Sequence, residues 1–458
     1  MTARKIPAWL QIFRVEDVRR KLLITLGLMI AYYLLTFFPL PGVSAYDLRK
    51  ISAMQDSPDL VGGIVNLFSG GAFFRLSVLA LGLIPFASAN SFVSFLFEVF
   101  PILKSEDTLS AQEVKRRTNL WVYLLVAPFS VLQAYLLFFS TSLDCSLRLS
   151  VLPRFNFETD FLSALTVLVC LVAGAYLVVW IAELINTYGF SSTGFHVIVF
   201  TSVALMLPTE IYKFWSGPQG TPPVFWRSLP AEMVHWLGAG VYLLFLLAGL
   251  LAMVYLILGR YKVPVAYPSL HRRSSFSGSS IHFPILMSAP FDALIDAQSI
   301  LMFFVLLLEL LACSSLAPLQ AVGNAVQAVM APNSLFSGPI LMLSFVFLGP
   351  WIAELRFMSV NAADLLRKSG AIIPNVRPGE PTEKYLQTLF RRIIITPTLL
   401  GGLILLIPWG ANILFGLKTS LLAGEALYFM VGFVKEFKDI VISQMTMRNY
   451  DRFLRHKP

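Results

Sequence analysis

The chain has 458 residues, of which 57% are hydrophobic and only 13% carry a charged side chain. A soluble domain carries roughly 25% charged residues, so the composition excludes an ordinary soluble enzyme or binding module. The formal net charge is +9, but Lys and Arg cluster in alternate loops between apolar segments, which indicates cytoplasmic loops rather than a direct nucleic-acid interface. Cys145, Cys170 and Cys313 are too few and too scattered for a disulfide framework or a metal site, and we expect no cofactor.

Ten apolar segments predict ten membrane spans, since a spanning helix needs about 20 apolar residues. They lie at residues 22–38, 73–103, 119–140, 161–184, 195–207, 234–259, within 283–312, and at 336–355, 394–415 and 419–445. Residues 1–21 are polar and basic without an early apolar core, so we expect an amphipathic cytoplasmic segment and no cleaved signal. An even number of spans and two basic ends place both termini, including a tail over residues 446–458, in the cytoplasm.

The longest external connection near the middle of the chain, residues 208–230, separates two sets of five spans. The halves so defined are residues 22–207 and 231–445. Two such halves often surround a central pathway in membrane proteins. The predicted fold class is therefore an all-α polytopic membrane protein of ten transmembrane helices in two pseudo-symmetric five-helix halves.

Residues 67–90 read LFSGGAFFRLSVLALGLIPFASAN, an unusual sequence for a segment in lipid. Gly70 and Gly71 break a short apolar piece, and Gly82 with Pro85 loosens the middle of the span that follows. Unsatisfied backbone groups are not tolerated in lipid, so a broken apolar element belongs inside protein or beside a water-filled cavity. Residues 61–71 are thus predicted to form a half-inserted plug, followed by a pore-wall helix.

The order of residues here, FSGGA followed two positions later by Arg75, resembles the SecY family, the central subunit of the bacterial protein-conducting channel. Two further blocks carry the resemblance, LLRKSGAIIPNVRPGEPTEKY at residues 365–385 and MRNYDRFL at residues 447–454. The resemblance implies a ten-span subunit without catalytic residues. Such a subunit moves unfolded secretory polypeptides across the membrane and releases transmembrane segments laterally into it.

The resemblance also implies an apolar ring that closes the pore by dewetting, together with the plug. The implied ring positions are Leu83, Ala87, Phe195, Val199, Asp296 and Ala423, and the implied plug positions are Val61, Ile64, Val65, Leu67 and Phe68. Family ring residues are bulky and apolar, whereas Ala87 and Ala423 are small and Asp296 is ionisable. Either the seal is built differently, or helix seven is shifted by one residue and brings in Ile295; ordinary packing is the further alternative.

Asp292 and Asp296 lie four residues apart, on one face of a predicted helix inside an apolar run. A charge at the bilayer centre costs about 2.5 to 3.5 kcal/mol, so such residues usually face a cavity and a partner. The resemblance places this helix against helix two at a lateral gate. The predicted polar gate cluster consists of Ser88, Asn90, Asp292, Asp296 and Gln298. The alternative is a helix that starts later, with Asp292 among the lipid headgroups.

Basic, turn-rich loops on the cytoplasmic side are candidate docking points for a partner. The expected contacts are Arg116, Arg117, Arg272, Arg273 and Arg377. By resemblance Arg377 engages a motor ATPase or the ribosome, and its planar fork suits carboxylate or phosphate contact. The alternative is that these charges only fix topology. The loop after span six, residues 260–282, is Ser-rich and less basic than the family usually has there.

The predicted partners are a SecE-like clamp subunit, a SecG-like subunit, a SecA-like motor ATPase or the ribosome, substrate polypeptides, signal peptides and membrane lipids. The predicted location is the plasma membrane of a bacterium, with a plastid membrane as the alternative. Two other functions stay open: a proton-coupled secondary transporter that uses Asp292 and Asp296, and a non-conducting paralogue that scaffolds membrane insertion. An intramembrane aspartyl protease is disfavoured because the chain has no GxGD motif.

Overall fold

The computed structural model describes most of the membrane-spanning part of the chain. The described residues are 16–43, 48–49, 60–100, 111–139, 161–190, 194–216, 226, 228–258, 260–265, 279–284, 289–311, 316–331, 334–358, 366, 372–417, 426, 428–435 and 437–442. Three predicted site residues, Arg272, Arg273 and Ala423, lie outside them, as do residues 1–15 and the tail from residue 443. For Val61 and Asp292 the structure describes the backbone only.

The chain divides into two compact units that differ from the two predicted halves. Unit 1 comprises residues 1–86, 127–212 and 429–458, and unit 2 comprises residues 87–126 and 213–428. The last helical residues therefore belong with the N-terminal spans. The reason lies in aromatic contacts within unit 1, where Phe429 packs edge-to-face on Phe68 and Phe433 stacks on Phe200 with ring centroids 4.1 Å apart.

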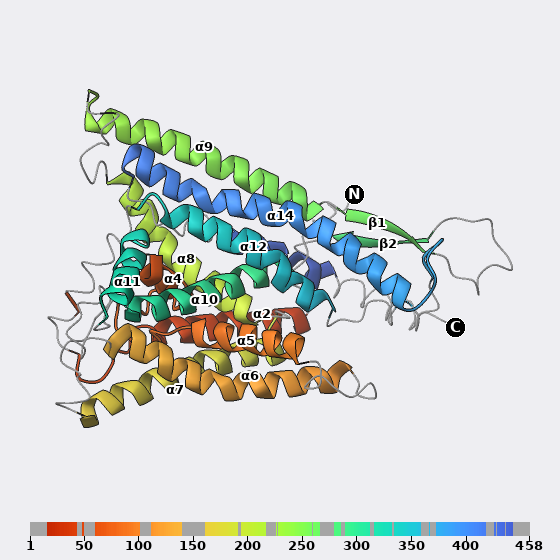
Figure 1. The fold of residues 1–458 in the computed structure, drawn as a ribbon, viewed down its shortest axis with the longest axis horizontal. Helices are drawn as coiled ribbons and strands as arrows, with labels where there is room; N and C mark the ends of the chain where they lie inside the picture. Colours follow the sequence, from red (N-terminus) through yellow and green to blue (C-terminus); the bar gives the residue numbers. More distant parts are fainter. Residues whose placement is uncertain are drawn as a thin grey trace, which may run out of the picture. The chain divides into compact units, whose positions relative to one another are not determined.

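Besides the residues from Phe429 onward, unit 1 contains helices of the N-terminal half of the chain (Figure 1). They are α2 (Glu16–Leu35), the short α4 (Leu60–Phe68), α7 (Phe161–Tyr188) and most of α8 (Gly194–Trp215), with the end of α6 (Ala111–Ala134) and its π-helical continuation Tyr135–Phe139. Helix α2 packs on α7. α5 (Ile84–Val99), like α6, passes from one unit into the other.

The second span is shorter than predicted. Residues 73–83 form a succession of turns, and α5 begins only at Ile84. Pro85 therefore stands in the first turn of α5, where its missing N–H costs no hydrogen bond, and not at a kink in the middle of a helix. Gly82, with φ +55°, adopts the left-handed conformation just before the helix.

The fifth span is longer than predicted. α8 continues through Pro208 to Trp215, so the connection between the predicted halves starts after this helix rather than at residue 208. A proline inside a helix removes one backbone hydrogen bond without necessarily ending the helix, and membrane helices tolerate this. The prediction ended this span at residue 207 and began the loop at Pro208, and these bounds were wrong.

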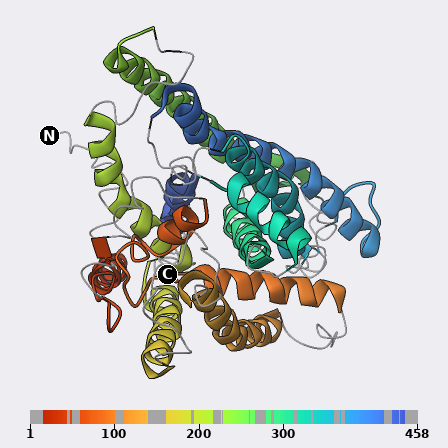
Figure 2. The same ribbon diagram turned by 60° about the vertical axis from the view of Figure 1, so that its left-hand side comes forward.

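Unit 2 contains four helices that pack in sequence, α9 on α14, α14 on α12, and α12 on α10 (Figures 1 and 2). Their bounds are Ala231–Leu258 for α9, Ala289–Leu310 for α10, Ser337–Met358 for α12 and Glu380–Phe415 for α14. Glycines allow the close approach: a methyl group on Gly402 would meet Val346, and one on Gly338 would meet Trp409. α12 and α14 therefore pack closely against each other.

Two elements of unit 2 were not predicted. A two-stranded antiparallel β-ribbon follows α9, with β1 (Arg260–Val265) paired to β2 (Ser279–Pro284) and Val263 opposite Ile281. A helix, α11 (Ala317–Val329), lies in the predicted external loop between α10 and α12 and packs on α10. Neither sequence has a strong signal, since the ribbon strands are short and α11 has no capping side chain.

Five described helices, α6, α7, α9, α12 and α14, are long and apolar enough to cross a membrane. Shorter apolar stretches occur in α5, α8 and α10. α14 has 36 residues and is about 54 Å long, whereas a hydrocarbon core is about 30 Å thick. Its first turns, which carry Glu380, Glu383 and Lys384, therefore extend beyond the membrane.

Gly174 tests the packing within unit 1. A methyl group at this position of α7 would collide with the carbonyl oxygen of Val78, so Gly174→Ala forces the two segments apart. We expect the substitution to lower the free energy of unfolding by about 1–3 kcal/mol, the cost of overpacking. Thermal unfolding of the purified protein in detergent, followed by tryptophan fluorescence, measures the effect.

The matched control is Gly240→Ala in α9, where a methyl group would have nothing within 4 Å. This substitution should leave stability unchanged or raise it by up to about 1 kcal/mol through helix propensity. Equal melting temperatures for the two variants would contradict the close approach of α7 to residue 78.

Candidate functional site

The predicted plug is a nine-residue helix, α4, that ends in a Schellman motif. The N–H of Gly71 donates to the carbonyl of Asn66 at 2.9 Å, and the N–H of Gly70 donates to that of Leu67 at 3.3 Å. Gly70 has φ +68° and Gly71 φ +83°, values that favour glycine. The two glycines that break the apolar segment therefore satisfy the carbonyls at the end of the helix.

Polar side chains of α4 and its end satisfy the backbone of the loop that follows. The Ser69 hydroxyl accepts from the N–H of Phe73 at 3.1 Å and donates to the Asn66 carbonyl, and the Asn66 side-chain oxygen accepts from the N–H of Phe74 at 3.4 Å. Further on, the Leu83 N–H donates to the carbonyl of Phe68. All six of these residues are buried, so the loop folds back on α4 within unit 1 without exposing these groups.

The same loop is tied to the chain just after α2. Pro39 and Ser77 form an antiparallel bridge, in which the Val78 N–H donates to the carbonyl of Phe38 at 3.0 Å. Arg75 donates to the hydroxyl of Thr36 at 3.0 Å, and its guanidinium lies 4.4 Å from the centroid of the Phe37 ring. The one basic residue of the loop therefore binds within unit 1.

The described plug side chains predicted from the sequence are all buried. They are Ile64, Val65, Leu67 and Phe68. Nine residues span about 14 Å, far less than a bilayer, so α4 does not cross a membrane by itself. The segment is thus a short buried helix in a protein environment, as its broken sequence indicated.

The predicted ring positions are divided between the two units. Leu83, Phe195 and Val199 belong to unit 1, and Ala87 and Asp296 belong to unit 2. Leu83, Val199, Ala87 and Asp296 are buried. Phe195 is partly exposed and stacks on Phe86, with ring centroids 4.0 Å apart. A joint role in a ring stays a prediction.

The predicted gate residues within unit 2 lie on α5 and α10. Ser88 and Gln298 are buried and Asn90 is half-buried. Asp292 is helical, since α10 begins at Ala289. Gln298 is completely buried, and neither polar atom of its amide has a hydrogen-bond partner among the described residues. Because leaving such a group unsatisfied costs about 1–3 kcal/mol, we expect the Gln298 amide to bind water or a polar group beyond the described residues.

Two predicted partner-binding loops, the one after α9 and the one before α14, share a small hydrophobic core. Its buried side chains are Val263 and Val265 of β1, Leu366, Ile373 and Leu386, with Val376 and Leu389 packed against them. The β-ribbon and the loop that carries Arg377 therefore form a single platform, which the sequence analysis treated as two separate tips.

Arg377 stands exposed on this platform on a fixed backbone. Its carbonyl accepts from the hydroxyl of Thr382 at 2.8 Å, and Asn375 and Gly379 adopt positive φ angles of 64° and 105°. The N–H of Val376 donates to the carbonyl of Ile373. The guanidinium thus projects from an ordered turn. Arg116 and Arg117, in α6, are exposed as well.

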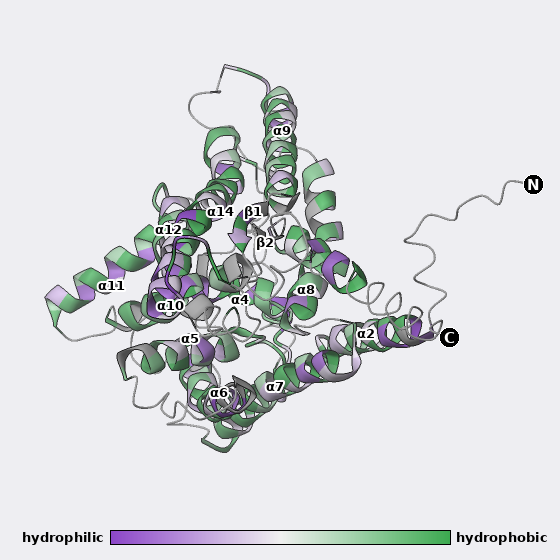
Figure 3. Ribbon diagram, turned by 90° about the vertical axis from the view of Figure 1, so that its right-hand side faces the viewer, coloured by the Kyte–Doolittle hydropathy of each residue, from purple (hydrophilic) through white to green (hydrophobic). Residues whose placement is uncertain are grey.

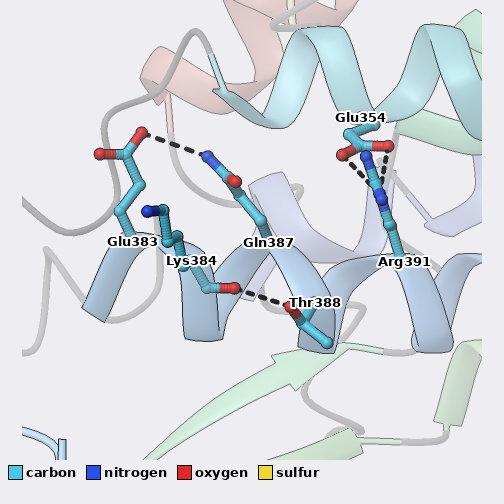
Figure 4. A network of polar contacts seen from close by, with 6 residues as sticks. All are labelled: Glu354, Glu383, Lys384, Gln387, Thr388 and Arg391. Carbon is cyan, nitrogen blue, oxygen red and sulfur yellow. Dashed lines mark hydrogen bonds and ion pairs between the residues drawn. The ribbon is translucent and has the colours of Figure 1, made fainter. Parts of the chain in front are cut away.

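An ion pair joins α12 to α14 in the same unit. The Nε of Arg391 donates to both carboxylate oxygens of Glu354, at 2.7 and 2.8 Å (Figure 4). Glu354 has only 11% of its side chain exposed, against 67% for Arg391. Next to the pair, Phe390 and Ile394 pack on Ala293 and Ala297 of α10, together with Ile352 and Ala353 of α12.

The first turns of α14 carry weaker, exposed polar contacts. Lys384 lies 2.7 Å from Glu380. Gln387 donates to Glu383 at 3.2 Å (Figure 4). The hydrogen bond from Lys384, and then its charge, lowers the pKa of the Glu380 carboxyl, while Glu380 raises the pKa of Lys384. Such surface pairs contribute little to stability, which makes this one a suitable reference for the Glu354–Arg391 pair.

Comparison with known proteins decides the family. The sequence model of the SecY family matches residues 77–437, which is more than half of the chain. The chain belongs to the SecY family.

Curated SecY relatives match over nearly the full length. The protein translocase subunit SecY of Streptomyces galbus is 28% identical, and the match covers 98% of this chain and 100% of the relative. That of Thermus thermophilus is also 28% identical, with 98% of each chain covered. This agreement extends beyond the three blocks on which the sequence resemblance was based.

Solved structures confirm the fold class. A SecY structure, described for a plug domain that stabilises the closed state of its translocation channel, has a TM-score of 0.60 at 15% identity and covers 96% of this chain and 97% of its own. Sec61 in a canine ribosome-channel complex has a TM-score of 0.55 at 14% identity, with 96% and 97% covered. The chain is an all-α polytopic membrane protein of the ten-helix SecY type.

Within this SecY-family fold, sequence reasoning missed Glu354 and Arg391. A signal was available, because Glu354 ends a run over residues 310–353 that contains no charged residue, and Arg391 with Arg392 immediately precedes the apolar part of α14. An acid and a base at the same boundary of two consecutive spans are natural partners. Their separation in the sequence concealed the pairing.

A double-mutant cycle tests the Glu354–Arg391 pair. We expect Glu354→Gln and Arg391→Gln, made singly and together, to show a coupling energy of about 1 kcal/mol, because one partner is largely shielded from solvent. Unfolding of the purified protein in detergent provides the measurement. Glu380→Gln with Lys384→Gln is the control on the same helix, for which a coupling close to zero is expected because both side chains are exposed. A coupling no larger than that control would contradict the link between α12 and α14.

Proposed function

We propose that the chain is a protein-conducting channel subunit, which translocates unfolded secretory polypeptides and releases transmembrane segments laterally into the membrane. The observation that carries the proposal is the short buried helix α4 with its self-satisfied loop, in a chain of the SecY family. A helix that is capped at its end and too short to span is suited to move as one piece. In this proposal α4 is the plug.

The polypeptide path in this proposal passes the predicted ring. Leu83 stands between α4 and α5, with its N–H bonded to the carbonyl at the end of the plug helix. A side chain in this position is shielded while the plug is seated, and displacement of α4 would expose it to a passing chain. The ring of apolar side chains would exclude ions by dewetting.

Crosslinking tests the path. In a background with Cys145, Cys170 and Cys313 replaced by serine, Leu83→Cys should crosslink to a stalled secretory chain in membranes that contain the intact translocase. The reason is that a translocating chain must pass the ring at contact distance. The matched control is Leu162→Cys in α7, whose side chain is 78% exposed on an apolar helix and should give no crosslink. Crosslinks of equal yield, or none at position 83, would overturn the proposed path.

The proposed lateral gate uses the polar residues of α5 and α10. Gln298 supports this role, since its buried amide lacks a partner among the described residues. Asn90 and Asp292 complete the proposed cluster, together with Ser88 and Asp296. A hydrogen-bonding cluster at the gate would hold it closed until a signal peptide supplies a larger apolar surface.

The rival functions make different demands. A proton-coupled transporter would lose coupling when Asp292 and Asp296 are both replaced by asparagine, whereas a channel should continue to move polypeptides. A scaffold that only assists insertion would give no crosslink from position 83. We propose no catalytic role for any residue, and the work of translocation would come from a cytosolic ATPase or from translation.

The proposed partners follow from the family and from the platform. A SecE-like clamp and a SecG-like subunit would complete the complex in the plasma membrane of a bacterium, with both termini in the cytoplasm. The platform around Arg377 would receive a SecA-like motor or the ribosome. The exposed guanidinium on an ordered turn supports this assignment, because the backbone that carries it is already fixed and its planar fork suits a carboxylate or phosphate.

Arg377→Glu should weaken binding of the purified motor ATPase or of ribosomes to membranes that contain the complex. We expect the affinity to fall at least about tenfold. A hydrogen bond to a charged group contributes about 1.5–3 kcal/mol, and about 1.4 kcal/mol corresponds to a tenfold change in Kd. Co-sedimentation or surface-binding measurements provide the test. Lys384→Glu, an equal change of charge on the first turns of α14, is the control and should have a smaller effect. Unchanged binding by the Arg377 variant would exclude Arg377 as the contact.

A further inference from the structure

Helix α11 is a short helix between two spans that the channel function does not use. Residues 311–316 connect it to the end of α10, and residues 330–336 connect it to the start of α12. It lies at the ends of these helices away from the β-ribbon and runs across their direction, as Figures 1 and 3 show. Both tethers are short, so α11 is held at the level where α10 and α12 leave the membrane.

The helix has three distinct sides. Gly323 is buried where α11 packs on α10. At 100° per residue, Leu319 and Val322 fall on one flank of Gly323, and Gln320 and Asn324 fall on the other. Leu319 is 37% and Val322 45% exposed, and both amide residues are exposed as well. One flank of α11 is therefore apolar and the other polar, and the side between them packs on α10.

The charge pattern around α11 is unusual for a loop in water. No Asp, Glu, Lys, Arg or His occurs anywhere in residues 310–353. This run includes the whole connection between α10 and α12, residues 311–336, and a water-exposed connection usually carries charged residues, because such side chains are mostly found at protein surfaces. Amides and small apolar residues alone are compatible with the boundary between headgroups and acyl chains, where amphipathic helices lie flat with one side in the hydrocarbon.

We propose that α11 is an interfacial helix that binds the bilayer surface, with Leu319 and Val322 among the acyl chains and Gln320 and Asn324 facing water. The occupant of the exposed apolar flank is lipid, because the tethers hold α11 at the membrane boundary and the polar flank points the opposite way from the apolar one. Lacking charge, the helix binds by apolar burial alone. Its depth is therefore independent of anionic lipid and of salt, in contrast to basic amphipathic helices.

Site-directed fluorescence tests the proposal in the full chain, reconstituted in nanodiscs with its partner subunits. Single cysteines at Leu319, Val322, Gln320 and Asn324, in the background without native cysteines, carry the dye NBD. Compared with labels at 320 and 324, labels at 319 and 322 should emit at shorter wavelength and be quenched less by aqueous iodide. Lipids with a nitroxide near the headgroup should quench the labels at 319 and 322 several-fold more strongly. These differences should be the same in zwitterionic and in anionic nanodiscs, and at low and high salt.

Three outcomes would overturn the proposal. Equal iodide quenching at all four positions would place α11 in water. Protection of positions 319 and 322 from both iodide and lipid nitroxide would mean that a protein segment covers this flank. A depth that increases with anionic lipid would mean that charge outside α11 drives the binding. All four positions are exposed side chains, so the labelled variants should fold, and an unchanged melting temperature confirms it.

Discussion

The structure around α4 depends on one constraint, that backbone N–H and C=O groups removed from water must find partners inside the protein. Residues 69–83 are neither helix nor sheet, yet they are almost entirely buried. Three side chains, Asn66, Ser69 and Ser77, supply missing partners together with the left-handed glycines. The loop can therefore be irregular because its polar groups are satisfied, and α4 can be short because the loop returns the chain to α5.

The sequence predicted the features that follow from composition and local chemistry. Apolar length identified α7, α9 and α12 to within a few residues, because lipid imposes a minimum length on a spanning helix. The glycine pair predicted the break after Phe68 because few other residues adopt positive φ. The SecY resemblance rested on these same glycines and on the turn before α14, which is built from Asn375 and Gly379.

Other features depend on tertiary contacts that no local pattern contains. Pro85 was expected to loosen the middle of a span and Pro208 to begin a loop, whereas the first lies in the opening turn of α5 and the second inside α8. A proline permits both outcomes, and packing decides between them. The grouping of Phe429 with α4, and the pairing of Glu354 with Arg391, likewise connect residues far apart in the chain.

The hydrophobic core shared by the β-ribbon and the Arg377 loop has a consequence for recognition. Because Val263, Ile373 and Leu386 pack together, a load applied to the ribbon is transmitted to the turn and to the base of α14. The ribbon and the turn then move as one unit. This unit is joined to α14, a continuous helix of 36 residues whose C-terminal part lies in the membrane. The effects of substitutions in the two stretches on binding should be non-additive. A ligand that binds either stretch should displace both together with the base of α14.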